Sequence, residues 1–252
     1  MIPLSPPLTI PAVDLLWVYL SQSPLLWLTA TLAAYAVGHS LHRRAAGNPL
    51  VNPVAIAVML LVGVLTATGT DYATYFDGAQ FVHFLLGPAT VALAVPLWRN
   101  LAEVRRRLLP MAVALVAGSL TAVISAVALA SLLGAGPQTV LSLAPKSVTT
   151  PIAMGVAERI GGLPSLTAVL VILTGIVGAM VATPLLNALR LSDDAKTGDW
   201  AARGFAVGVA AHGIGTARAF QVHPLAGTFA GIAMGLNGLL TAILAPVLVS
   251  FF

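Results

Sequence analysis

The chain contains no cysteine, and only 8% of its 252 residues carry a charge. The absence of cysteine excludes disulfide bonds and zinc sites built from thiolates. The shortage of charge argues against a soluble protein, because soluble helices need polar faces and residues 108–144 contain no charged residue. The five histidines lack metal-ligand spacing and carboxylates are few, so we expect neither a metal or other cofactor nor an acid–base enzyme.

Hydrophobic residues dominate what is present. They make up 58% of the chain, the mean hydropathy is +0.97, and several stretches exceed the roughly 18 uncharged residues that suffice to cross a bilayer. This composition predicts an all-α polytopic membrane protein. The net charge of +4 does not indicate a nucleic-acid partner, because most lysines and arginines lie in short breaks between hydrophobic stretches, where they orient the chain.

The hydrophobic stretches predict about six to eight transmembrane or re-entrant segments. Residues 1–23 are expected to form an interfacial segment, because their apolar run is short and contains a carboxylate, and residues 24–252 to form the transmembrane domain. The basic breaks at 42–44 and 99–107 are assigned to the cytoplasmic side, and the acidic, aromatic loop 69–77 to the outside. The expected spans are residues 24–41, 49–68, 81–98, 108–133, 164–189 and 224–248.

Two further segments are too short to cross the bilayer as simple helices. Pro145–Ile160 has about 16 residues, roughly 24 Å of helix, which is less than the hydrocarbon thickness. Ala201–Arg218 is also short and is rich in glycine. Each segment either crosses the membrane or enters it and returns. Re-entry is favoured for the first segment, because it leaves Arg190, Lys196 and Arg203 on the cytoplasmic side, and the second is interpreted in the same way.

Two weak internal matches suggest a repeat. Residues 85–97 resemble residues 173–185, and the Ile-Ala-Met-Gly of residues 152–155 recurs at 232–235. In a chain this rich in Ala, Leu and Gly, such matches arise by chance as readily as by duplication. A true duplication would fit the inverted repeats of secondary carriers, which bind substrate on discontinuous helices near the membrane midplane.

Four short polar motifs interrupt the hydrophobic stretches, at residues 87–90, 145–151, 212–218 and 235–238. Helix-breaking Gly and Pro beside hydroxyls and cations are tolerated at membrane depth only where they face protein or a water-filled cavity. The motifs therefore predict a binding or permeation site. The candidate substrate-binding residues are Thr90, Lys146, Ser147, Thr149, Thr150, His212, Gly213, Gly215, Thr216, Arg218 and Asn237.

These residue types suit a small carboxylate. The hydroxyls before Pro151 predict a capped helix start, and the free amides of such a start bind anions. Lys146 or Arg218 would supply the counter-charge. Each residue also has a structural alternative: Lys146 can snorkel to the interface, and Arg218 can orient its segment. His212 can be a neutral, hydrogen-bonded residue rather than a proton carrier, and Asn237 can bridge helices rather than bind substrate.

The same motifs resemble those of the LrgB/CidB family. The resemblance extends from about residue 25 to the C-terminus, and we find no departure from the family within the four matching stretches. These stretches occur in the family's order, at residues 84–97, 143–153, 211–219 and 233–238.

Membership in this family implies two competing functions. Bacterial members are described as antiholin-like modulators of murein hydrolase export and cell lysis, and they act with a small LrgA/CidA-type membrane partner that is not fused here. A plastid relative exchanges glycolate and glycerate, and bacterial pairs are linked to pyruvate uptake. The residues favour a carrier, because a holin-type protein has no reason to place cations, histidine and helix starts around broken segments.

The resulting prediction is a carrier of small monocarboxylates in the bacterial inner membrane, with substrates of the pyruvate, lactate, glycolate or glycerate type. The alternative is an antiholin-like modulator that acts with an LrgA/CidA-type partner. The expected partners are the carboxylate, the lipid bilayer and further copies of the chain in a homo-oligomer.

Overall fold

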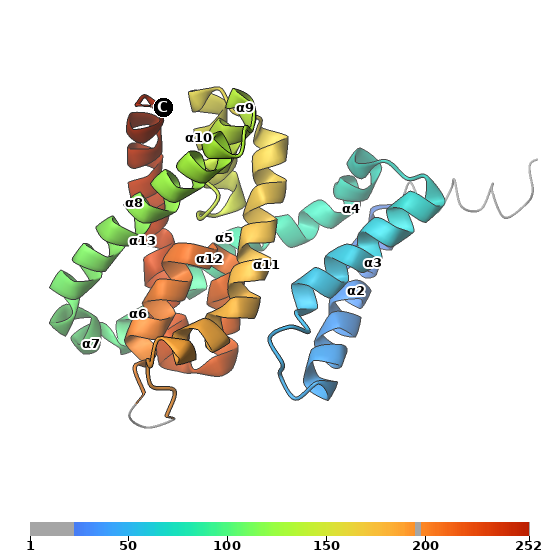
Figure 1. Ribbon diagram of the computed structural model, residues 1–252. Helices are drawn as coiled ribbons and strands as arrows, with labels where there is room; N and C mark the ends of the chain where they lie inside the picture. The colour runs from blue at the N-terminus through green and yellow to red at the C-terminus, as the bar shows by residue number, and fades with distance from the viewer. Residues whose placement is uncertain (1–22, 195–197, 252) are drawn as a thin grey trace, which may run out of the picture. The chain divides into compact units, whose positions relative to one another are not determined.

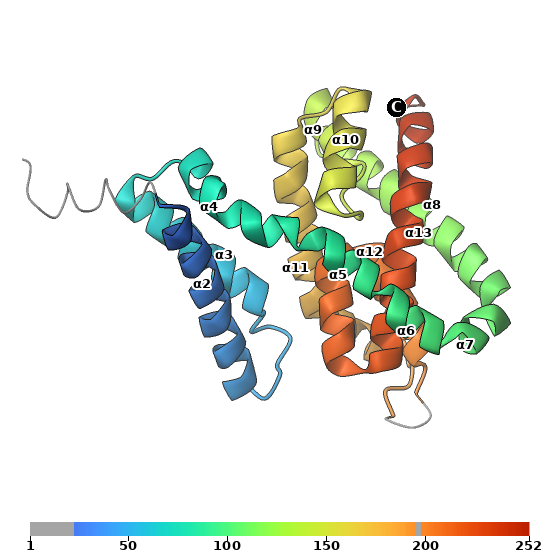
Figure 2. The ribbon, with the colours of Figure 1, turned by 180° about the vertical axis from the view of Figure 1, so that it is seen from behind.

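The computed structural model of the chain describes residues 23–194 and 198–251 (Figures 1 and 2). The expected interfacial segment, residues 1–23, lies outside this range except for its last residue. The described residues form helices and no strand, which confirms the predicted fold class. The helices are α2 (Pro24–Arg44), α3 (Pro53–Thr68), α4 (Tyr72–Phe84), α5 (Leu86–Ala92), α6 (Ala94–Arg99), α7 (Leu101–Arg106), α8 (Leu108–Leu132), α9 (Pro137–Leu143), α10 (Thr150–Ile160), α11 (Pro164–Ala188), α12 (Trp200–Val222) and α13 (Pro224–Val249).

The chain divides into two compact units. The first contains the described residues up to 47 together with 53–89, and the second contains residues 48–52 and the chain from residue 90 onward. The sequence did not indicate this division within residues 24–252. Every candidate site residue belongs to the second unit.

Glycines bring the helices of the first unit together. A side chain on Gly38 of α2 would collide with Pro53 at the start of α3, and one on Gly78 of α4 would collide with Trp27 of α2. Trp27 is buried at this contact and meets Tyr75 of α4 edge to face, with ring centroids 5.8 Å apart. The first unit is therefore a cluster of three helices in which α2 packs against both α3 and α4.

The expected loop at residues 69–77 is largely helical, because α4 already begins at Tyr72. Asp71 explains the early start: its side-chain oxygen accepts a hydrogen bond from the amide of Thr74 at 3.3 Å, which is the interaction of an N-cap. Tyr72 and Phe76 then lie one turn apart and stack, with ring centroids 5.8 Å apart. Asp71 thus caps α4, and the aromatic residues that suggested a loop lie on this helix.

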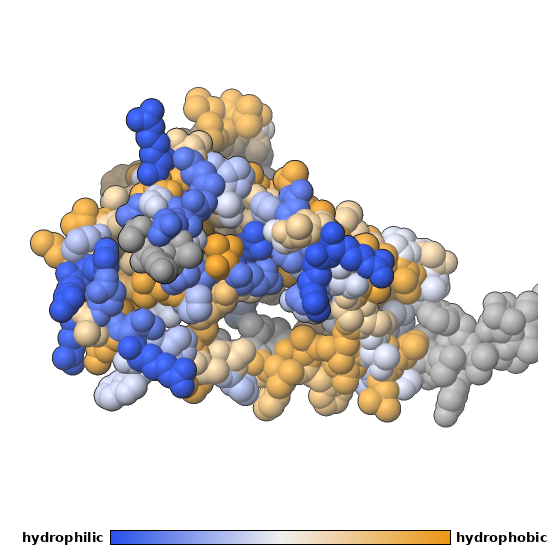
Figure 3. All heavy atoms as spheres, turned by 90° about the horizontal axis from the view of Figure 1, so that it is seen from below, coloured by the Kyte–Doolittle hydropathy of each residue, from blue (hydrophilic) through white to orange (hydrophobic). Residues whose placement is uncertain are grey.

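Four segments in the described part of the chain are long and apolar enough to cross a membrane: Tyr72–Arg99 and the helices α8, α11 and α13. They include four of the six expected spans. The other two are also helical, but α2 is less apolar, and α3 has only 16 residues. The chain is a multi-pass membrane protein. Seen from the end at which α7 and the start of α12 lie, hydrophilic residues gather on the second unit, as expected where helices end at a membrane interface (Figure 3).

The expected third span is interrupted, as its Gly-Pro motif suggested. Turns at Leu85 and Leu93 divide it into α4, α5 and α6. In the longer sequence match, residues 85–97 belong to the short helices α5 and α6 and the turns before them. Residues 173–185, by contrast, lie inside the continuous α11. The shorter match compares residues 152–155 of the 11-residue α10 with residues 232–235 of the 26-residue α13. The two matches do not mark equivalent elements, so they give no support to a duplication.

Residues 137–162 form a hairpin at one end of the second unit, which we call hairpin 1 (Figure 1). The end of α10 returns to the end of α9, where the Ser142 hydroxyl accepts a hydrogen bond from the amide of Leu163 at 2.7 Å. Val140 and Ala144 pack against the last half of α8. Hairpin 1 thus begins where α8 ends and finishes where α11 begins, which is the geometry that re-entry requires.

A second hairpin lies within α12, whose backbone is not helical at residues 211–212. Gly204 lies against Ala226 at the start of α13. One turn further along, Gly208 lies against Ala230. Because both residue numbers increase together, the first arm of α12 runs parallel to α13.

The second arm of α12 runs in the opposite direction. Phe220 lies against Gly227, near the start of α13, whereas Gly213 lies against Met234, further along it. Residues 200–222 therefore form hairpin 2, and the predicted short, glycine-rich discontinuous segment is confirmed. Because the 25-residue α11 connects hairpin 1 to hairpin 2, the two hairpins enter the unit from opposite ends (Figures 1 and 2).

The contact between α12 and α13 leaves no room for a side chain at Gly208. A Cβ atom there would collide with the carbonyl oxygen of Ala230, which belongs to the backbone and cannot rotate away. We expect Gly208→Leu to destabilise the folded protein by about 3 kcal/mol or more. Thermal unfolding of purified protein in detergent measures the effect. Gly235→Leu is the matched control, because nothing lies within 4 Å of a Cβ added at that position. Equal melting temperatures for the two variants would contradict this packing.

Candidate functional site

The tips of the two hairpins meet at the side chain of Asn237, in the middle of α13. Its Nδ2 donates hydrogen bonds to the carbonyl oxygens of Ser147 in hairpin 1, at 3.2 Å, and Val209 in hairpin 2, at 3.0 Å. Its Oδ1 accepts from the hydroxyls of Ser119 at 2.5 Å and Thr241 at 3.2 Å. Asn237 is buried, and these four bonds use its full hydrogen-bonding capacity. The two broken segments therefore meet, and Asn237 bridges them.

The broken backbone explains why an amide stands at this position. A helix leaves its last carbonyls without intrahelical donors, and Val209 lies in the last turn of the first arm of hairpin 2. Ser147 lies in the non-helical link between α9 and α10. Because a buried carbonyl without a donor is costly, two such groups facing each other need a donor of two hydrogens between them. The Asn237 amide supplies it.

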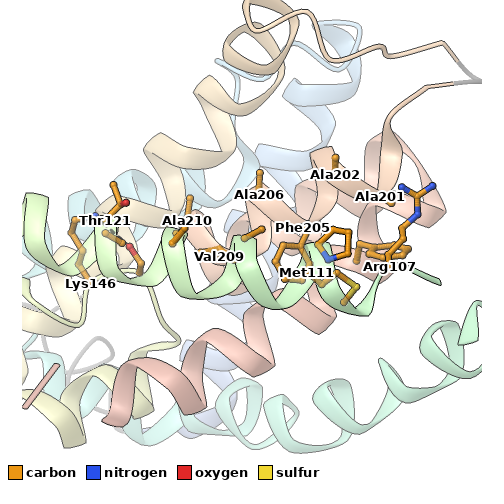
Figure 4. A pocket seen from close by; sticks show the side chains of 17 residues that line it. Arg107, Met111, Thr121, Lys146, Ala201, Ala202, Phe205, Ala206, Val209 and Ala210 are labelled. Carbon is orange, nitrogen blue, oxygen red and sulfur yellow. Dashed lines mark hydrogen bonds between the residues drawn. The ribbon is translucent and has the colours of Figure 1, made fainter. Parts of the chain in front are cut away.

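A cavity of about 650 Å³ opens beside this contact, between α8, the tip of hairpin 1 and the first arm of hairpin 2. Figure 4 shows Lys146 and Thr121 at one end of the cavity and Arg107 at the other, with Phe205 and Val209 along the wall between them. Alanines make up much of the remaining lining. A mostly apolar cavity of this size with a few polar groups is typical of a site for a small organic ligand.

The two cations of this cavity have different surroundings. Arg107 is paired with Glu103, whose Oε1 lies 2.7 Å from Nη2. Lys146 has no carboxylate partner in the part of the chain that the structure describes, and its Nζ donates to the Ser147 hydroxyl at 3.3 Å. Within residues 23–194 and 198–251, no carboxylate lines the cavity. The end at the tip of hairpin 1 therefore carries an uncompensated positive charge that attracts anions.

His212 forms the reversal of hairpin 2 and has a structural role there. Its backbone has a φ of +39°, a conformation that non-glycine residues adopt at a cost. Its ring Nε2 lies 2.9 Å from the carbonyl oxygen of Val171, and because a carbonyl only accepts, Nε2 carries the proton. Gly175 of α11 makes room for the ring, since a Cβ there would lie 2.6 Å from Cε1. His212 thus holds the tip of hairpin 2 against α11.

The start of α10 only partly matches its prediction. Thr149 has the extended backbone of an N-cap, and Pro151 stands in the first turn, as expected. No side chain makes a capping hydrogen bond, however, so the prediction of hydroxyl capping is wrong. Of the residues predicted in this motif, Lys146 and Ser147 line the cavity, whereas Thr149 and Thr150 do not.

The residues predicted at 213–218 lie on the second arm of hairpin 2 and do not line the large cavity. Gly215 packs closely against residues 207 and 211 of its own hairpin. The Thr216 hydroxyl donates to the carbonyl oxygen of His212 at 2.8 Å. Arg218 lines a second, smaller cavity. Thr90 lies on α5, and its side chain is outside what the structure describes.

Sequence reasoning missed several residues of both cavities. Thr121 of α8 lines the large cavity, and Ser119 completes the hydrogen bonds of Asn237, but an isolated hydroxyl in an apolar helix gave no signal. Arg203 was interpreted as an orientation signal, yet it is buried beside Arg218 in the smaller cavity. The sequence offered one clue, because Arg203 directly precedes a glycine-rich apolar run.

Comparison with known proteins shows the family of the sequence. A profile of the LrgB-like family matches residues 31–251. The chain belongs to the LrgB-like family. Among its relatives, protein YwbG of Bacillus subtilis (strain 168) is 36% identical over 79% of this chain and 86% of its own length. No solved structure matches the chain.

Two family relatives have names that refer to holins. A Holin-like protein CidB of Staphylococcus epidermidis (strain ATCC 35984 / DSM 28319 / BCRC 17069 / CCUG 31568 / BM 3577 / RP62A) is 27% identical over 90% of this chain and 96% of its own length. An Antiholin-like protein LrgB of Bacillus cereus (strain B4264) is 27% identical over 92% of this chain and 98% of its own length. Both similarities cover nearly the whole of each protein, so the two hairpins and the cavity lie within the shared region.

Proposed function

We propose that this chain is a carrier for small monocarboxylates, of the pyruvate, lactate, glycolate or glycerate type, in the bacterial inner membrane. The observation that carries the proposal is the uncompensated charge of Lys146 at the tip of a broken hairpin, inside a cavity. A carboxylate that leaves water needs a fixed cation or oriented donors to replace its hydration. Lys146 supplies the cation. The hydroxyls of Ser147 and Thr121 bind the 2-hydroxy or 2-keto oxygen of the substrate.

The two hairpins supply the moving parts that a carrier needs. Secondary carriers bind substrate near the midplane on discontinuous helices and expose the site to each side in turn. Hairpin 1 and hairpin 2 enter from opposite ends and are joined through one side chain, Asn237. A displacement of one hairpin relative to the other opens the cavity toward one side of the membrane while the other side stays closed.

The names of the relatives favour a second function. Two relatives are named Holin-like protein CidB and Antiholin-like protein LrgB, and neither name refers to transport. The second function would be an antiholin-like modulator of cell lysis that acts with an LrgA/CidA-type partner, as the family resemblance implies. The names support this function more directly than they support transport, whereas the cavity and the broken helices support transport.

Proteoliposomes that contain the chain alone distinguish the two functions. We expect labelled pyruvate, lactate or glycolate to enter them faster than it enters protein-free liposomes, and unlabelled substrate to compete with this uptake. A trapped fluorescent dye should stay inside, because a carrier opens to one side at a time. Dye release without saturable uptake would contradict the carrier and support a holin-type function.

A further inference from the structure

A second, smaller cavity brings two arginines together at the open end of hairpin 2. It has a volume of about 30 Å³. Arg203 comes from the first arm of the hairpin and Arg218 from the second, and no carboxylate of the described residues lines the cavity.

Arg203 is the better defined of the two. It is only 4% exposed, its Nη1 donates to the carbonyl oxygen of Leu191 at 2.7 Å, and its guanidinium lies 5.5 Å from the ring centroid of Trp200. Trp200 in turn stacks on His223, with ring centroids 4.7 Å apart. Among the described residues no carboxylate pairs with Arg203, although a buried charge normally requires a partner. A guanidinium has five donor hydrogens, so most of its fork remains available to a ligand.

The cavity lies where helices end. Its lining includes Leu186 in the last turn of α11, Trp200 at the start of α12, Val222 at the end of α12 and Ala226 near the start of α13. Ends of membrane-spanning helices lie at the level of lipid headgroups. The positive-inside rule assigns this end to the cytoplasm, where the leaflet is rich in anionic lipids.

We propose that Arg203 and Arg218 bind a phosphate oxyanion that bridges the two arms of hairpin 2. Arginine forks match phosphate oxygens bidentately and are less strongly hydrated than lysine, which suits a half-buried site. The cavity volume of about 30 Å³ is only slightly larger than the space that one water molecule needs. Phosphate oxygens therefore enter the cavity, and the rest of the ligand stays outside it. The position of the cavity at the ends of α11, α12 and α13 favours the phosphate of an anionic phospholipid over free phosphate.

Native mass spectrometry of the full-length chain tests this site. We expect phosphatidylglycerol to bind more tightly than phosphatidylcholine, and Arg218→Gln to weaken phosphatidylglycerol binding about tenfold or more. Arg106→Gln is the control, because Arg106 is an exposed arginine on α7 that lines neither cavity. Arg218→Lys should restore binding only in part, since it keeps the charge and loses the fork.

A second experiment identifies the source of the phosphate. Thermal unfolding is measured with inorganic phosphate and with phosphatidylglycerol micelles, using chloride at equal ionic strength as reference. Stabilisation by either ligand that Arg218→Gln abolishes supports the site and assigns its ligand. The proposal is overturned if neither ligand raises the melting temperature of the unaltered chain. It is also overturned if both lipids bind equally to the unaltered chain and to folded Arg218→Gln. Neither result bears on carboxylate uptake, which depends on the other cavity.

Discussion

Replacing Lys146 by methionine will reduce carboxylate uptake at low substrate concentration by about a hundredfold or more. Methionine keeps the length and apolar stem of the side chain and removes the charge. Removing the cation that pairs with a buried carboxylate costs about 3–5 kcal/mol, because the anion is then left without compensation in a mostly apolar cavity. The measurement is saturable uptake of labelled pyruvate or glycolate into proteoliposomes, at matched amounts of folded protein.

Two further variants test whether the loss of uptake comes from the missing charge at residue 146 or from a general disturbance of the protein. Lys146→Arg keeps the charge and should retain much of the uptake. Arg106→Met removes an exposed arginine of α7 that lines neither cavity, and it should leave uptake unchanged. Uptake by Lys146→Met at the level of Arg106→Met would place the substrate elsewhere and strengthen the antiholin-like function.

Most of the helices could be predicted from hydropathy because the bilayer imposes a length and a composition on each span. The sequence also located both discontinuities, since Lys146 to Pro151 and His212 to Arg218 combine helix breakers with polar groups in otherwise apolar stretches. Asp71 was misjudged because an acidic residue beside aromatics suits a loop and a helix cap equally well. Only its hydrogen bond to the amide of Thr74 distinguishes the two.

The candidate site was harder to predict because it depends on which face of each broken segment turns toward which neighbour. Motif content placed Lys146 and Arg218 in one site, yet the reversal at His212 turns the second arm of hairpin 2 toward another cavity. A backbone reversal at a histidine has only a weak sequence signature, because positive φ is uncommon outside glycine even though histidine adopts it more often than most residues. Likewise, Ser119 reaches Asn237 across 118 positions of the chain, a contact that no local pattern encodes.

The hydrogen bonds of Asn237 make it the residue whose loss should most affect the fold. The orientation of its amide is fixed by chemistry: the backbone oxygens of Ser147 and Val209 can only accept, so the NH₂ group must face them. The hydroxyls of Ser119 and Thr241 can turn to carbonyls of their own helices if Asn237 is replaced. The two backbone oxygens have no such alternative, because each lies at a break in a helix.

Asn237→Leu is therefore expected to destabilise the folded chain by about 2–6 kcal/mol, which is the cost of two buried carbonyls that lose their donors. Leucine has a similar volume, so a cavity contributes little to this loss. Asn237→Asp should be at least as harmful, since it places an anion against the same two oxygens. Thermal unfolding in detergent measures both, with the exposed Asn187→Leu of α11 as control. If Asn237→Leu melts at the temperature of the Asn187→Leu control, the two hairpins are held together by contacts other than this amide.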